Sequence, residues 1–348
     1  MCLLKQKLHL EIITTITKMK KSLFPISVLV LVAIILGLIG YDRHVTNNNA
    51  KKYQTTKTEQ TAKTETKKDE TPKQRIYCIG DSLTIGNDFA SYPLTLESLS
   101  NSQVIKIGGN QDTSLDLAIR VGRIKIYVNN ITIPQGKTPV DVPLYDEQNQ
   151  PLDVLKSTGT NFSDVTINGI KGTLSYDANR NMHTFTRNEA GKETPLNQLT
   201  QVESDVPDFN ENDIVVLFSG TYDNQNNLDI YRTITYQRAI INQIKTQKYI
   251  VVSLTSRRQN ASVRDQNNML KEEHKDHFLE YRAYLLDHGL ADANITPTAQ
   301  DQQDLNNNYI PSSLLKDDKL NGNDAFNTLL AKQVNQKMID LQYIKAQN

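Results

Sequence analysis

Cysteine is scarce in this sequence, and the charges balance. The 348 residues include two cysteines, Cys2 and Cys78, which are too few for a disulfide framework or a thiolate metal site. Lysine and arginine together number 39, and so do aspartate and glutamate. The chain therefore lacks the basic excess with which proteins neutralise nucleic-acid phosphates, and we expect no nucleic-acid partner. Cys78 falls in an apolar run and is interpreted as a buried residue without a redox role.

Histidine is also scarce, and none follows His288. The absence of histidine from the C-terminal part of the sequence matters because histidine is the usual proton acceptor near neutral pH. His274 and His277 are interpreted as part of a solvated, charged helix face in "EEHKDH", since a third ligand for a metal is not evident. The sequence predicts neither a metal nor a cofactor. The six histidines are His9, His44, His183, His274, His277 and His288.

One long apolar run, "LFPISVLVLVAIILGLIG" at 23–40, carries no charge. It has about the length of a membrane-spanning helix, and the lysines that precede it favour the cytoplasmic side. A signal peptide is the alternative, but "LGLIGYDRH" lacks a small-x-small cleavage site. We expect a single-pass cell-membrane protein with a cytoplasmic tail at 1–22 and an extracellular remainder. Met19, in "MKK", is an alternative start to Met1.

The stretch after this run has almost nothing apolar to bury. It reads "TNNNAKKYQTTKTEQTAKTETKKDETPKQ", a composition typical of chains that stay disordered. We expect residues 41–74 to form a tether that separates a folded domain from the membrane.

From residue 75 onward, continuous apolar runs alternate with helical patterns. The runs at 75–81, 102–109, 212–220 and 248–256 are typical of parallel strands that are covered on both faces. Helical patterns follow at 231–247 and 269–290. This alternation predicts an α/β fold with a doubly wound parallel sheet.

The stretch 123–212 interrupts that alternation with short β-like segments broken by Gly, Pro and Asn. Because the α/β pattern resumes afterwards, we predict a small β domain inserted into an α/β domain made of 75–122 and 213–348. Tyr176, Phe185 and Arg187 are candidates for a sugar-contacting face of this insertion, although core packing explains the aromatic residues equally well.

"IGDSLT" ends the first predicted strand with Gly80, Asp81 and Ser82. This motif resembles the nucleophile block of the GDSL, or SGNH, hydrolases. Segments such as "IPQGK" and "VTINGIKGTL" resemble a subgroup with an inserted β domain. The resemblance covers the chain from about residue 75 and implies a flavodoxin-like doubly wound fold, an ester hydrolase (esterase or O-deacetylase) activity and Ser82 as the nucleophile. Asp81 would lie in the substrate-binding part of the site.

The other three blocks of that family depart from its pattern. "GGNQDTS" places Gln111 at the position of the oxyanion glycine, and "FSGTYDN" places Tyr222 at that of the oxyanion asparagine. In "KDDKLNGND" the acid of the Asp-x-x-His block is Asp318, but its histidine is replaced by Asn321. The resemblance implies Ser82 and Asp318 as the catalytic pair, with Gln111, Tyr222 and Asn321 as substrate-binding residues.

Two functions remain open. Three replaced positions favour a degenerate module that binds cell-envelope glycan or acylated carbohydrate. The alternative is an active serine esterase or deacetylase with a substitute base such as His183, which would lean over the site from the insertion. A serine hydroxyl needs such a base to become a nucleophile.

Overall fold

The computed structural model describes residues 73 onward, with gaps, and these all belong to a compact unit at 72–348. The expected tail at 1–22, the expected membrane span at 23–40 and nearly all of the expected tether at 41–74 lie outside the described residues. Among the helices described, none combines the length and hydropathy that a membrane crossing requires. The described ranges are 73–86, 91–158, 161–204, 206, 208–256 and 260–346.

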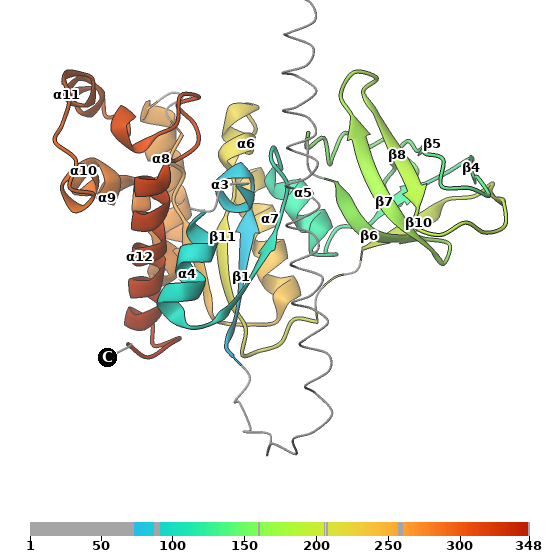
Figure 1. The fold of residues 1–348 in the computed structure, drawn as a ribbon, viewed down its shortest axis with the longest axis horizontal. Helices are drawn as coiled ribbons and strands as arrows, with labels where there is room; N and C mark the ends of the chain where they lie inside the picture. The colour runs from blue at the N-terminus through green and yellow to red at the C-terminus, as the bar shows by residue number, and fades with distance from the viewer. Residues whose placement is uncertain are drawn as a thin grey trace, which may run out of the picture. The chain divides into compact units, whose positions relative to one another are not determined.

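A five-stranded parallel sheet forms the centre of the α/β part, in the order β13-β12-β11-β1-β2. Numbered along the chain, this is the order 2-1-3-4-5 of flavodoxin-like doubly wound sheets, whose order reverses between the first and third strands. The predicted α/β class with a parallel sheet is confirmed (Figure 1). The strands are β1 (Arg75–Gly80), β2 (Gln103–Ile107), β11 (Ile214–Phe218), β12 (Tyr249–Val252) and β13 (Phe278–Leu279).

The fifth strand, β13, corrects the prediction of one helical stretch at 269–290. That stretch contains the end of α8 (Asn260–His274), the 3-10 turn η1 (Lys275–His277), β13 and α9 (Tyr281–Asp287). Lys275 has a φ of 49°, which ends the helix. The strand has only two residues, so it is too short to show an alternating pattern within its helical surroundings.

Both faces of the sheet are covered, because alternate residues of β1 point to opposite sides. Ile76 and Cys78 pack with α4 (Tyr92–Ser100) and α12 (Asp324–Asp340). On the other face, α5 (Ser114–Arg120), α7 (Ile230–Ile244) and α8 cover Tyr77 and Ile79 (Figure 1). Cys78 is buried in β1 as predicted, and this burial raises the pKa of its thiol to about 12.

The chain also contains several short helices, and doubly wound proteins bind their ligands beyond the carboxyl ends of the strands. Two of them begin directly after a central strand: α3 (Ser82–Ile85) follows β1, and α6 (Thr221–Gln225) follows β11. The others are α10 (Gly289–Asp292), α11 (Ala299–Asn306) and η2 (Ser312–Leu314).

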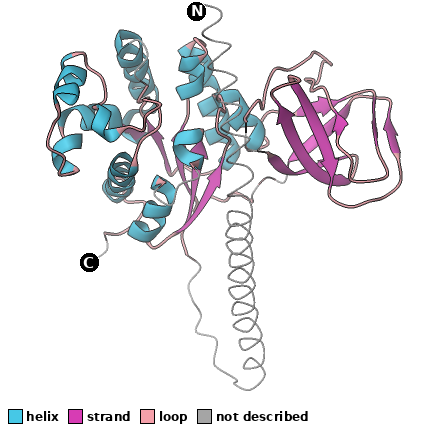
Figure 2. Cartoon of the chain, turned by 45° about the horizontal axis from the view of Figure 1, so that its top comes forward, coloured by secondary structure: helices cyan, strands magenta, loops and turns pink. Residues whose placement is uncertain are grey.

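Between α5 and β11 the described residues form strands and loops (Figure 2). Six strands pair antiparallel in the order β3-β10-β6-β7-β8-β5, and β4 pairs with β9. Leu115 and Ile119 of α5 pack into the same apolar core as this sheet. The strands are β3 (Ile126–Val128), β4 (Ile131–Ile133), β5 (Val140–Asp141), β6 (Phe162–Ile167), β7 (Ile170–Asp177), β8 (Met182–Arg187), β9 (Thr194–Leu196) and β10 (Thr200–Ser204).

Two of the residues considered for a sugar-contacting face are buried. Phe185 is fully buried in the core of the insertion, and Arg187 is buried while donating to the backbone carbonyls of Pro134 and Lys192. Tyr176 is half-buried. Of the two interpretations left open, core packing therefore holds for Phe185, and Arg187 holds neighbouring loops together instead of facing a ligand.

Candidate functional site

Ser82 lies at the carboxyl edge of the sheet, directly after β1. Asp81 caps the N-terminus of α3, and its Oδ1 accepts the Leu83 N–H at 3.0 Å. Gly80 allows the ends of β1 and β11 to approach closely, since a Cβ on this residue would lie 2.4 Å from the Phe218 carbonyl oxygen. This strand–turn–helix arrangement leaves Ser82 half-buried at the boundary of a cavity.

Burial raises the pKa of Asp81 to about 7, although the Leu83 N–H and the nearby Thr221 hydroxyl act to lower it. The charges of Asp112 and Asp223 also act to raise this pKa. The carboxyl group is fully buried. Near neutral pH it is therefore poised between its protonated and ionised forms, beside the serine.

Tyr222 is the side chain that meets Ser82. It lies on α6, just beyond β11, and β11 pairs with β1 at the point where the strand order reverses. The Tyr222 hydroxyl is 3.4 Å from the Ser82 Oγ. Burial raises the pKa of Tyr222. The charges of Asp81 and Asp318 also act to raise it, whereas the hydrogen bond with Ser82 acts to lower it. The phenol stays protonated at neutral pH, so it can donate a hydrogen bond but does not serve as a base.

Asn321 and Asp318 come from the turn between η2 and α12. The Asn321 Nδ2 donates to the Asp318 Oδ2 at 2.7 Å. The backbone N–H groups of Leu320 and Asn321 donate to the Asp318 Oδ1, at 2.9 and 2.8 Å. Burial acts to raise the pKa of Asp318, but these three hydrogen bonds and the charge of Lys316 outweigh it and hold the pKa below its usual value. The carboxylate thus orients the side-chain amide of Asn321.

Ser82 and Asn321 line one small cavity of about 20 Å³, roughly the space that one water needs. The structure thereby brings together four of the predicted residues: Tyr222 contacts Ser82, Asn321 lines the same cavity as Ser82, and Asp318 accepts from Asn321. Lys316 lines the same cavity and was not predicted from the sequence. Its position two residues before Asp318 in "LLKDDKL" was the available indication.

Three of the described histidines, His183, His274 and His277, have ring nitrogens within hydrogen-bond distance of groups other than Ser82. The His183 Nε2 lies 3.2 Å from the Leu155 carbonyl oxygen, and burial lowers the pKa of His183. His274 is buried, with its Nε2 2.9 Å from the Gln237 Oε1. The interpretation of His274 as part of a solvated face is therefore wrong, because this side chain joins α8 to α7. His277 lies 3.0 Å from the Tyr249 carbonyl oxygen.

Gln111 lines a different and larger space, a cleft of about 750 Å³. Tyr222 borders this cleft as well, so its side chain lies between the cleft and the Ser82 cavity. One wall of the cleft belongs to the insertion, at 153–156. The remaining lining residues are Thr113, Asp116, Gln225, Asn226, Leu228 and Arg232.

Buried carboxylates hold the insertion wall in place. Asp112 pairs with Arg120 and accepts from the Ser157 hydroxyl, and the Asp116 Oδ1 accepts the Leu155 N–H at 2.6 Å. Burial, followed by the charge of Asp112, raises the pKa of Asp116 to about 6. Sequence reasoning missed this network. Its available indication was the presence of two carboxylates and an arginine, Asp112, Asp116 and Arg120, within nine residues of the sequence.

No family model and no curated protein matches the chain. Among solved structures, it is similar to a lipolytic protein of the G-D-S-L family from Desulfitobacterium hafniense, with a TM-score of 0.39 and 12% identity, over 76% of this chain and 99% of that one. A member of the lipolytic protein G-D-S-L family from Veillonella parvula has a TM-score of 0.40 and 12% identity, over 76% and 97% of the two chains. Both proteins come from the family that the sequence motifs resemble.

Proposed function

We propose that this chain is a membrane-anchored extracellular protein with an SGNH-like α/β domain that binds cell-envelope carbohydrate and has lost serine hydrolysis. The observation that supports the proposal is that the Asn321 amide, and not an imidazole, donates to Asp318 and lines the same small cavity as Ser82. The ester hydrolase class describes its origin, and binding describes its present activity.

The loss of hydrolysis follows from the protonation chemistry of the site. A serine attacks an ester only when a neighbouring group accepts its proton. The Asn321 amide does not accept a proton near neutral pH, and the raised pKa of Tyr222 keeps its hydroxyl protonated. The family's oxyanion donors are also replaced, and the loss of one such donor typically costs about 10²–10³ in kcat.

The binding role rests on the cleft beside Tyr222. Its volume of about 750 Å³ lies within the usual range for ligand sites. Gln111, Asp116, Asn226 and Arg232 supply polar groups along it, and Tyr222 supplies an aromatic surface. This mixture suits the hydroxyl groups and apolar faces of sugar rings. The expected anchor at 23–40 would place the cleft outside the cell, near envelope polysaccharide.

Hydrolysis is tested on the full chain with a fluorophosphonate probe and p-nitrophenyl acetate. We expect the wild-type protein to react no faster than Ser82→Ala. Asn321→His should then introduce Ser82-dependent labelling, because the new imidazole would face both the Asp318 carboxylate and the Ser82 cavity. Labelling or turnover of the wild type that Ser82→Ala abolishes would refute the loss of hydrolysis.

Binding and placement are tested separately. Purified cell-envelope polysaccharide should retain the wild-type protein, and Arg232→Gln, in the cleft, should weaken retention. Arg180→Gln is a matched control on the exposed side of the insertion.

The extracellular placement is tested with protease. Protease added to intact cells should digest the region after residue 40. Equal retention of both variants contradicts the assignment of binding to the cleft, and protection from protease contradicts the extracellular placement.

The second candidate function is an active serine esterase or deacetylase, and Lys316 is the observation that favours it. Lys316 lines the Ser82 cavity, whereas the substitute base considered from the sequence, His183, has its Nε2 at the Leu155 carbonyl. Serine–lysine pairs are a known variant of the catalytic triad. Activity of the wild type that both Ser82→Ala and Lys316→Met abolish would establish this candidate in place of the first.

A further inference from the structure

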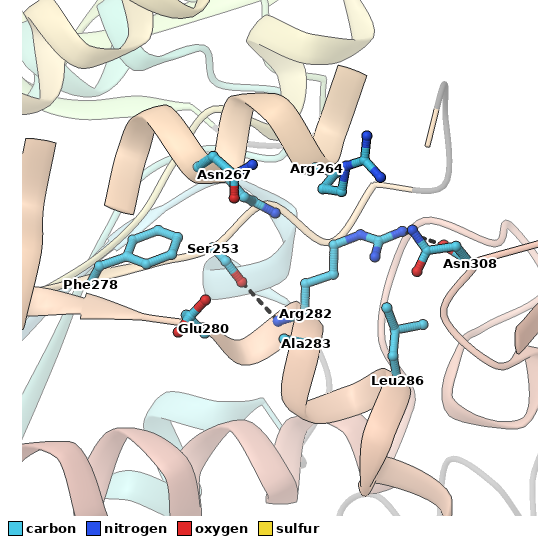
Figure 3. Close-up of a pocket in the computed structure, with 10 residues that line it drawn as sticks. Ser253, Arg264, Asn267, Phe278, Glu280, Arg282, Ala283, Leu286 and Asn308 are labelled. Carbon is cyan, nitrogen blue, oxygen red and sulfur yellow. Dashed lines mark hydrogen bonds between the residues drawn. The ribbon is translucent and has the colours of Figure 1, made fainter. Parts of the chain in front are cut away.

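A separate cavity of about 220 Å³ lies beyond the carboxyl ends of β12 and β13 (Figure 3). It shares no lining residue with the Ser82 cavity or with the cleft. Ser253 follows β12, Arg282 comes from α9, and Arg264 and Asn267 come from α8, while Asn308 closes the side toward which Arg282 extends. Several parts of the chain thus converge on one space.

Arg282 is the unusual residue of this cavity, because its guanidinium is buried and no described residue supplies a counter-charge. The residue is only 5% exposed. Its Nη2 donates to the Asn308 carbonyl oxygen at 2.6 Å, but its Nε is buried and has no hydrogen-bond partner. Burial lowers the pKa of Arg282, and no neighbouring carboxylate opposes that effect. Within the described residues, Arg282 forms no ion pair.

The one carboxylate that lines the cavity does not neutralise Arg282. Glu280 is exposed and accepts from the Lys271 Nζ at 2.8 Å. A second positive charge stands at the opening, because Arg264 is exposed and its only ion pair within the described residues is a 3.5 Å contact with Asp265. The charges around the cavity therefore favour an anion.

A buried charge without a partner is strongly unfavourable, so proteins pair buried cations with anions. We propose that this cavity binds a small oxyanion, a phosphate or carboxylate group, on the Arg282 guanidinium. The planar fork of arginine matches the geometry of both groups. The cavity volume is below the range of pockets for drug-sized ligands, which suits a free anion or the anionic end of a larger molecule. Arg264 adds attraction at the opening.

The test is the melting temperature of the full chain in sodium phosphate or sodium acetate, compared with sodium chloride at equal ionic strength. A ligand that binds only the native state raises the melting temperature in a saturable way. We expect such a rise with at least one of the two anions, in the wild type and in Ser82→Ala alike. A rise with phosphate but not with acetate would identify the ligand as a phosphate group, and a rise with acetate but not with phosphate would identify it as a carboxylate group.

Arg282→Met should abolish the rise, and Arg282→Lys should keep a weaker one, since it retains the charge without the fork. The absence of a rise in the wild type with either anion, or an equal rise in Arg282→Met, overturns the proposal. If Arg282→Met does not fold, the proposal is tested instead by the Kd of the anion for the variant Arg264→Gln. We expect it to raise the Kd about two- to fivefold, as for an exposed charge. Arg238→Gln, outside the cavity, should leave the Kd unchanged. Equal Kd values for these two variants overturn the proposal.

Discussion

Replacing Asp81 with asparagine should stabilise the protein above neutral pH. The wild-type carboxyl is fully buried, and its pKa is raised to about 7 from a usual value of 3.8. Between these two values the folded protein holds a proton that the unfolded chain has released, so stability falls as the pH rises. At about 1.36 kcal/mol per pKa unit, the loss amounts to about 4 kcal/mol by pH 8. Asp81→Asn removes this loss.

The substitution preserves the other role of the residue. Asparagine is as good an N-cap as aspartate, so its Oδ1 can still accept the Leu83 N–H. The free energy of unfolding is measured by urea denaturation at pH 4 to 8, followed by circular dichroism because the chain has no tryptophan.

The gain of Asp81→Asn over the wild type should grow from near zero at pH 4 to several kcal/mol at pH 8. Asp81→Ala is the matched control, and it should gain about 1 kcal/mol less because it also loses the cap. A gain that does not change with pH, or a loss of stability at pH 8, would refute the reasoning.

Two further predictions concern buried charges elsewhere. Asp112→Asn leaves Arg120 buried without its counter-ion and should cost about 3–5 kcal/mol in urea denaturation, whereas Arg180→Gln, in an exposed pair, should change stability by less than about 1 kcal/mol. Equal costs would contradict the role of burial. Burial lowers the pKa of His274 from 6.5 to about 4, so the unfolded chain takes up the proton first. This group alone costs about 3 kcal/mol between pH 6.5 and 4, against the opposite contribution of Asp81. His274→Gln should therefore gain stability relative to the wild type as the pH falls through this range in urea denaturation, and a difference that does not change with pH would contradict the assignment.

The sheet was predictable where its strands are long and buried on both faces. β1 and β11 have continuous apolar stretches in the sequence, and both are buried at nearly every position. β13 has only two residues at the sheet edge, so the helical pattern on either side concealed it. His274 was misinterpreted for a similar reason, since its charged neighbours in the sequence conceal its contact with Gln237 of α7.

The site was predictable only in part. Ser82 and Tyr222 follow adjacent parallel strands, so the strand order alone brings them to the same edge. Gln111 instead lines the cleft, in a loop that is fixed to the insertion. The neighbouring Asn110 donates to the Thr158 carbonyl oxygen at 3.0 Å, and Asp112 accepts from Ser157. These hydrogen bonds join residues more than 40 positions apart, and the pattern along the chain does not reveal such pairs.

The position of β1 between β2 and β11 has a consequence for the order of folding. On one edge, β1 pairs with β2, which lies close to it in the sequence. On the other edge, β1 pairs with β11, which brings together residues such as Arg75 and Asp213 that are 138 positions apart. During synthesis, β1 therefore emerges with one edge unpaired and waits for the whole insertion to leave the ribosome. Closing a loop of this length slows folding. Because the insertion has its own apolar core, it can fold first and draw the two ends together. Its early folding would then limit the time for which the nascent sheet exposes an edge to other chains.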